Sequence, residues 1–157
     1  MRFRAYVALL FVTVAGAAPL PRQSARSIEL VGIQAKLYYP ATATFSRNIL
    51  AEPRFALWNT IIGAGDAESP SNATLVLVDL RGAPGTYGER TTVRLRAVAG
   101  SRVLVNRAAQ LSEFGPDGRQ AVGFWIYGTG CEAVDLTATL SLRSDSVRAR
   151  IPFECGE

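Results

Sequence analysis

The residue types that most often carry catalysis or bind metal ions are scarce in this chain. Histidine is absent, and only two cysteines, Cys131 and Cys155, occur among 157 residues. A Ser-His-Asp or Cys-His arrangement therefore cannot form, and neither can a histidine proton shuttle or a histidine-ligated zinc, copper or iron site. Two cysteines without histidine also fall short of a zinc shell. We therefore expect a protein that is not an enzyme and holds no metal or cofactor.

Carboxylates are the remaining groups that could do acid–base chemistry. Asp66 and Glu68 share a loop at residues 63–72, whereas the other acidic residues are scattered along the chain. A glycoside hydrolase needs two carboxyl groups facing each other across a cleft, and scattered positions do not indicate one. The loop could offer oxygen ligands to calcium, although it lacks the dense acidic pattern of a dedicated calcium loop. Asp66 and Glu68 are thus a possible ligand loop, with a solvated surface loop as the alternative.

Four arginines could bind an anion. Arg94 and Arg96 lie on the outward register of one predicted strand, and Arg148 and Arg150 lie on the outward register of another. If the two strands are neighbours, the guanidinium groups form a patch for an anionic glycan, a lipid head group or an acidic partner. The alternative is ordinary solvation of the strand faces, where arginine also discourages edge-to-edge pairing.

Aromatic residues could build a platform that stacks on sugar rings. The candidates are Tyr38, Trp58, Tyr87, Trp125 and Tyr127. Tyr38 is the best exposed candidate because its register faces outward. Trp58 and Trp125 lie in apolar surroundings, so we expect them in the core.

The N-terminus has the three parts of a secretory signal. Arg2 and Arg4 are followed by an apolar stretch at 5–14 and by small residues at Ala15 and Ala17. We predict a signal peptide at 1–17 and a flexible lead-in at 18–26, and an uncleaved anchor is the alternative. Removal of Arg2 and Arg4 lowers the formal net charge from +4 to +2. A charge this small does not indicate a nucleic-acid partner, and no apolar run is long enough for a membrane span in the mature chain.

The two cysteines fit an oxidising compartment, either the periplasm or the extracellular medium. A Cys131–Cys155 bridge would close a loop of about 25 residues and stabilise the fold by about 3.5 kcal/mol in the chain-entropy model. Two buried free thiols are the alternative.

Alternation of apolar and polar residues predicts strands along most of the remaining chain. They lie at 31–39, 74–80, 92–99, 102–108, 121–127, 134–143 and 147–155, with weaker signals at 42–50 and 55–62. We expect one all-β domain at 27–157, a β-sandwich of the immunoglobulin-like, Greek-key type with about seven to nine antiparallel strands.

The apolar patterns also predict how some strands are covered. Residues 92–99 place Val93 and Leu95 inward, 74–80 is expected to be buried on both faces, and 121–127 is expected to be central in its sheet. Pro152 falls on an outward position and lacks an N–H, so the last strand is expected at an edge.

These observations favour an exported, non-catalytic binding or accessory protein, secreted or periplasmic, whose partner is an envelope protein or a glycan. The alternative is a structural subunit that pairs through an exposed edge strand, the first or the last. A small secreted enzyme that uses carboxylates is the third and least favoured hypothesis.

Overall fold

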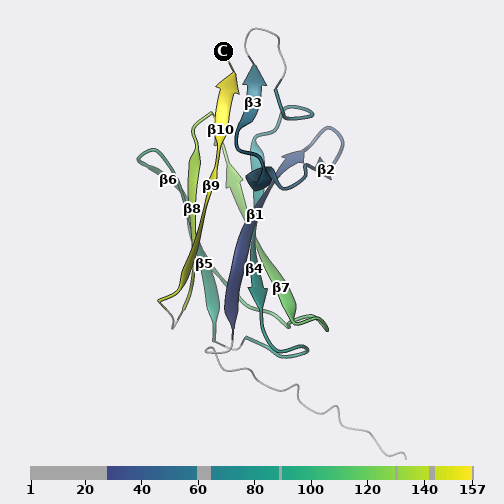
Figure 1. Ribbon diagram of the computed structural model, residues 1–157, viewed down its shortest axis with the longest axis vertical. Helices are drawn as coiled ribbons and strands as arrows, with labels where there is room; N and C mark the ends of the chain where they lie inside the picture. The colour runs from purple at the N-terminus through teal and green to yellow at the C-terminus, as the bar shows by residue number, and fades with distance from the viewer. Residues whose placement is uncertain (1–27, 60–64, 89, 130, 142–143, 157) are drawn as a thin grey trace, which may run out of the picture.

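The computed structural model describes residues 28–59, 65–88, 90–129, 131–141 and 144–156, and most of them lie in β-strands (Figure 1). Two sheets face each other and enclose the hydrophobic core. Within these ranges there is no α-helix, and one 3-10 helix, η2, spans Ile49–Ala51. The chain is therefore an all-β sandwich, as its apolar spacing predicts. The predicted signal peptide and lead-in lie outside the described residues.

Each of the two facing sheets has four strands, and all pairs within them are antiparallel. The first sheet has the order β2-β1-β4-β7, with strands Thr44–Phe45, Glu29–Tyr39, Ala73–Arg81 and Arg119–Tyr127. The second has the order β6-β5-β8-β9, with strands Arg102–Gln110, Thr92–Ala99, Val134–Leu140 and Ser146–Ile151. A parallel pair, β3 (Phe55–Asn59) and β10 (Phe153–Gly156), extends beyond one end of the sandwich in Figure 1.

The chain crosses between the facing sheets at β4 to β5, at β6 to β7 and again at β7 to β8. As a result β1, β4 and β7 lie side by side although they come from distant parts of the chain. Crossings of this kind define Greek-key connectivity, and the arrangement is that of an immunoglobulin-like sandwich. The predicted fold class is confirmed.

Alternate residues of the facing sheets build the core. Val93 and Leu95 of β5 are fully buried, as predicted, and the intervening Arg94 is exposed. Phe114, in the connection between β6 and β7, is also fully buried and fills the core from one end. Residues that face inward from β4 and β7 complete the other layer.

The predictions for the burial of β4 and for the position of β7 in its sheet are both wrong. On β4 only the inward residues, such as Val76, are fully buried, whereas Leu75 and Leu77 are half-buried on the outer face. β7 was expected to be central, but it ends its sheet and pairs with β4 on one side. The physical reason is that outward apolar side chains on neighbouring strands shield one another laterally, so an apolar sequence does not require a second covering layer.

The predicted last strand is interrupted at Pro152, which separates β9 from β10. Proline has no N–H to donate to a strand ladder, so the pairing changes there. β9 ends its sheet beside β8, as expected for an edge strand. β10 instead pairs with β3, and Phe153 at its start is only 1% exposed.

Cys131 is a disulfide cysteine in the structure, and none of the described cysteines is a free thiol. The side chain of Cys155 lies outside those that the structure describes, so its pairing with Cys131 stays a prediction. In the described ranges no helix is long and apolar enough to cross a membrane.

Candidate functional site

Four aromatic rings form an exposed cluster on the outer face of the β2-β1-β4-β7 sheet. The cluster consists of Tyr38, Phe45, Trp125 and Tyr127. Cross-strand register brings them together, because Tyr38 lies opposite Phe45 on one side and opposite Ala73 on the other, and Ala73 lies opposite Tyr127. Ala73, which lies between Tyr38 and Tyr127, has a short side chain and is buried.

The rings of this aromatic cluster contact one another, and three of them are open to solvent. Tyr38 is half-buried, so the prediction that it is the best exposed candidate is wrong, and Tyr127 is more exposed. The Trp125 and Tyr127 rings are nearly parallel, with centroids 6.1 Å apart and an interplanar angle of 15°. Tyr38 meets Trp125 edge-on at 5.8 Å and Phe45 at 5.3 Å. Phe45, Trp125 and Tyr127 are 45%, 40% and 64% exposed. Apolar patches of this kind with a polar surround often mark interaction sites.

A flat aliphatic strip continues from the aromatic cluster along the same face. Leu75 lies opposite Trp125, and Leu77 lies opposite Gly123. A Cβ atom at Gly123 would lie 3.2 Å from Leu75 Cδ1 and 3.7 Å from Leu77 Cδ2, so the leucine side chains lean over the glycine. The glycine thus keeps the middle of the face free of protruding groups.

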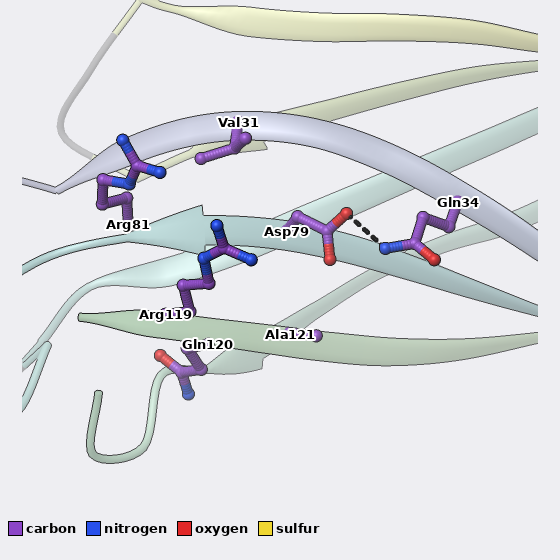
Figure 2. A pocket seen from close by; sticks show the side chains of 7 residues that line it. All are labelled: Val31, Gln34, Asp79, Arg81, Arg119, Gln120 and Ala121. Carbon is purple, nitrogen blue, oxygen red and sulfur yellow. Dashed lines mark hydrogen bonds between the residues drawn. The ribbon is translucent and has the colours of Figure 1, made fainter. Parts of the chain in front are cut away.

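A polar pocket of about 350 Å³ lies at the other end of this face (Figure 2). Its lining residues are Val31, Gln34, Asp79, Arg81, Arg119, Gln120 and Ala121. Gln34 Nε2 donates a hydrogen bond of 2.8 Å to Asp79 Oδ2. A β-bulge between Leu30 and Gly32 turns Val31 out to 54% exposure, although the alternation of the sequence places it inward. Figure 2 shows Arg81, Arg119 and Asp79 projecting on the same side of the sheet.

A backbone link fixes the pocket end of the sheet. The Gly82 N–H donates to the Gly118 carbonyl oxygen at 2.9 Å, which joins the segment after β4 to the segment before β7. Gly118 has a φ of +73°, and a Cβ atom there would lie 2.5 Å from the Gly82 oxygen. Glycine is therefore required at 118, and the link holds Arg81 and Arg119 at the same level of the sheet.

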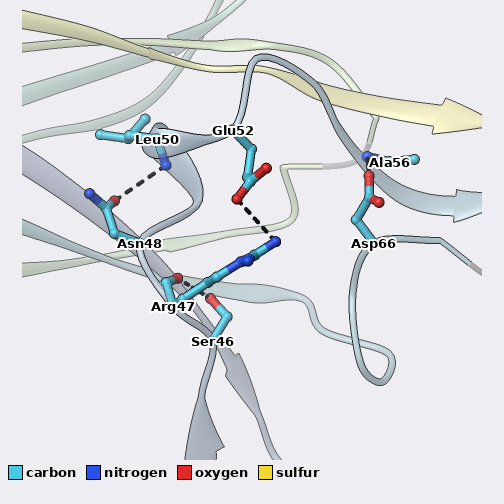
Figure 3. Close-up of polar contacts among 7 residues, drawn as sticks. All are labelled: Ser46, Arg47, Asn48, Leu50, Glu52, Ala56 and Asp66. Carbon is cyan, nitrogen blue, oxygen red and sulfur yellow. Dashed lines mark hydrogen bonds and ion pairs between the residues drawn. The ribbon is translucent and has the colours of Figure 1, made fainter.

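The predicted ligand loop is used for a structural link (Figure 3). The Asp66 carboxylate accepts a 2.7 Å hydrogen bond from the Ala56 N–H, and the Asp66 N–H donates to the Ala56 carbonyl oxygen at 2.7 Å. The Glu68 N–H donates to the Tyr39 hydroxyl oxygen at 3.2 Å. Figure 3 also shows Asn48 capping η2 near the Arg47–Glu52 ion pair. Among the described residues no three metal-ligating side chains lie together.

The four predicted arginines are exposed on the outer face of the second sheet, but β8 separates the two strands that carry them. Arg96 and Arg148 lie opposite the same residue of β8, two strand spacings or about 10 Å apart. Arg150 Nη1 lies 2.9 Å from Asp135 Oδ1, and Arg94 Nη1 donates to Asn106 Oδ1 at 3.0 Å. The condition that the two strands are neighbours is therefore not met.

Trp125 is predicted to lie in the core, and this is wrong because its position on β7 faces outward. The signal was present in the sequence: Trp125 and Tyr127 share a register opposite to that of Val122, Phe124 and Ile126. The side chain of Trp58, the other tryptophan predicted in the core, lies outside those that the structure describes. Sequence reasoning also missed other side chains of the face, among them Phe45, Arg81 and Arg119.

No family model matches this chain, and no curated protein is significantly similar to it in sequence. The chemistry of the site is therefore what points to a function.

Proposed function

We propose that this protein is an exported, non-catalytic carbohydrate-binding protein that acts in the periplasm or the surrounding medium. The proposed binding face comprises the aromatic cluster, the strip of Leu75 and Leu77, and the polar pocket. The observation that carries the proposal is the exposed aromatic cluster beside a pocket of hydrogen-bonding side chains.

A sugar ring has an apolar surface of C–H groups and a rim of hydroxyl groups. Exposed aromatic rings such as Trp125 and Tyr127 offer flat apolar surface to the first. Side-chain amide, carboxylate and guanidinium groups, such as those of Gln34, Asp79 and Arg81, offer donors and acceptors to the second. Aromatic rings and polar side chains lie on the same face, as a ligand with both apolar C–H surfaces and hydroxyl groups requires.

The dimensions of the face favour an extended ligand. From Tyr127 to Ala121 the strand rises by about 20 Å. Between them lie Gly123, which has no side chain, and the half-buried Leu75 and Leu77. A chain of several linked sugar rings could contact the aromatic cluster and the polar pocket at once.

Asp79 is the one carboxylate among the lining residues of the polar pocket, and this supports binding rather than hydrolysis. Asp66 is held by the Ala56 N–H, Asp79 by Gln34, and Asp135 by Arg150. Hydrolysis of a glycosidic bond needs two carboxyl groups that face each other across the substrate. The proposal therefore assigns recognition to this chain and no bond-breaking step.

Export is proposed from the N-terminal pattern of Arg2, Arg4 and the apolar stretch that follows. The disulfide state of Cys131 supports an oxidising compartment. We propose Cys155 as its partner, because the chain contains only these two cysteines.

Affinity electrophoresis through gels that contain soluble polysaccharides tests the proposal. The folded chain without residues 1–17 should be retarded by at least one neutral or acidic polysaccharide. The Trp125→Ala/Tyr127→Ala variant should lose that retardation, whereas Val103→Ala, which removes an exposed apolar side chain from β6, should keep it. Unretarded migration in every gel of a broad panel would contradict the proposal.

Assembly through an edge strand is a second candidate function. A groove of about 420 Å³ runs between β6 and β7, which end their sheets on the same side of the sandwich. Leu104, Val105 and Phe124 line this groove. Sedimentation analysis at rising protein concentration tests this second function. Oligomers that dissociate in the Leu104→Lys variant would support assembly. A monomer at all concentrations would contradict assembly.

A further inference from the structure

Two arginines lie directly opposite each other at the pocket end of the binding face. Arg81 of β4 and Arg119 of β7 are cross-strand partners, and both are exposed. Like charges in directly opposite positions destabilise a sheet. A bound anion between the two guanidinium groups would relieve this repulsion and accept hydrogen bonds from both.

The guanidinium groups retain donors for such an anion. Arg81 makes no side-chain hydrogen bond or ion pair with any residue that the structure describes. Arg119 Nε lies 3.7 Å from Asp117 Oδ2, and both side chains are more than 60% exposed, so this contact adds little. Glu29 lies opposite Arg81 on β1, yet no ion pair joins the two.

The carboxylate inside the pocket is already engaged, because Asp79 accepts a hydrogen bond from Gln34. Asp79 also discriminates between ligands. A membrane surface would bring lipid charge against this carboxylate, whereas a sugar chain whose acidic group lies between the two arginines could present a hydroxyl group to it.

A third cation lies near the aromatic end of the face. Lys36 of β1 lies opposite Leu75, which in turn lies opposite Trp125. No ion pair joins Lys36 to a residue in the described part of the chain. Leu75, the partner of Lys36, and Arg81 are six residues apart on β4, which corresponds to about 20 Å along the strand. Cations thus bracket the flat strip.

We infer that the ligand of this face is an acidic polysaccharide, with sugar rings on the aromatic cluster and an acidic group between Arg81 and Arg119. The inference rests on the proposed function and adds the charge of the ligand. Guanidinium groups bind carboxylate and sulfate oxygens in a fixed, paired geometry. Because the site is exposed, its contribution should fall as the salt concentration rises.

Isothermal titration with two matched polymer pairs tests the inference: polygalacturonate against its methyl ester, and dextran sulfate against dextran. At low salt the protein should bind the acidic member of at least one pair about tenfold more tightly, as expected for a charge-assisted contact. Arg81→Gln/Arg119→Gln should abolish that preference, so that the acidic and the uncharged member of the pair bind with equal affinity. The matched control Arg94→Gln/Arg96→Gln removes two exposed arginines from the other sheet and should change nothing.

Three outcomes would overturn the inference. The first is equal affinity for both members of each pair, together with loss of all binding in Trp125→Ala/Tyr127→Ala. This result would refute the acidic preference but would still support carbohydrate binding. A preference lost in Arg94→Gln/Arg96→Gln would place the anion on the wrong sheet. Binding to vesicles of anionic phospholipid, with no polysaccharide bound, would refute both the inference and the proposed function.

Discussion

Neighbouring residues of β7 have opposite surroundings, and this separates recognition from stability. Phe124 points into the sandwich and is 6% exposed, whereas Trp125 points to solvent and is 40% exposed. The two side chains are of similar size and adjacent in sequence. Their substitution should therefore change different properties of the protein.

Trp125→Ala should weaken carbohydrate binding at least tenfold and lower the free energy of unfolding by only about 1 kcal/mol, because the ring lies at the surface. Phe124→Ala should lower the free energy of unfolding by about 3 to 5 kcal/mol, because the substitution leaves a cavity in the core. Urea unfolding and polysaccharide titration measure the two effects. Equal loss of stability in the two variants would show that Trp125 is a core residue.

Gly118→Ala should destabilise the protein more than Gly85→Ala. Both glycines have a positive φ, so each substitution carries a conformational cost of about 1 to 2 kcal/mol. Only at Gly118 would the new Cβ atom also collide with the Gly82 oxygen, at 2.5 Å. Thermal unfolding of the two variants measures the difference, and equal losses would contradict a special role for the Gly82–Gly118 link.

At the scale of elements, the sequence predicts a strand well where polar and apolar residues alternate. In β5 the arginines face water and Val93 and Leu95 face the core, so local pattern and burial agree. In β7 the outward residues Trp125 and Tyr127 are apolar as well, and local pattern cannot distinguish a binding face from a second core. For this reason β7 was predicted to be central.

The pairing of strands that are distant in sequence is beyond what local pattern can predict. Arg81 and Arg119 become neighbours only through the register of β4 against β7, and Phe45 reaches Tyr38 only through the short strand β2. The binding face is therefore a property of sheet topology.

Phe153 should anchor β10 of the parallel pair in the core. Phe153→Ala should lower the free energy of unfolding by about 3 to 5 kcal/mol, because its ring is 1% exposed. Glu154→Ala, at the next and exposed position, should change it by less than about 0.5 kcal/mol. Chemical denaturation of both variants checks this, and a tolerated Phe153→Ala would mean that β10 is not anchored in the core.

The whole molecule is asymmetric. The outer face of one sheet carries the aromatic cluster and leucines, whereas the outer face of the other carries arginine and threonine at positions such as Arg94, Arg96, Thr137 and Arg148. Water solvates the second face well, and the first face leaves aromatic surface exposed to it. This asymmetry predicts that a ligand binds on one side of the sandwich.

The proposed Cys131–Cys155 bridge should stabilise the molecule as a unit. Cys131→Ser and Cys155→Ser should each lower the free energy of unfolding by about 2 to 4 kcal/mol, because a closed loop restricts the unfolded chain. The double variant should lose no more than either single variant, since one bond is removed in all three. Fully additive losses would show that the two cysteines do not pair with each other.

Chemical-shift mapping tests the binding face most directly. Short oligosaccharides of galacturonic acid, titrated into isotope-labelled protein, should shift backbone amide signals of β1, β4 and β7, with the largest changes from Arg119 to Tyr127. Signals of β5, β8 and β9 should stay in place. Shifts that concentrate on the arginine face of the second sheet, or on Leu104 to Ala109 of β6 with no shifts in β1 and β4, would contradict the assignment of the aromatic face as the binding site.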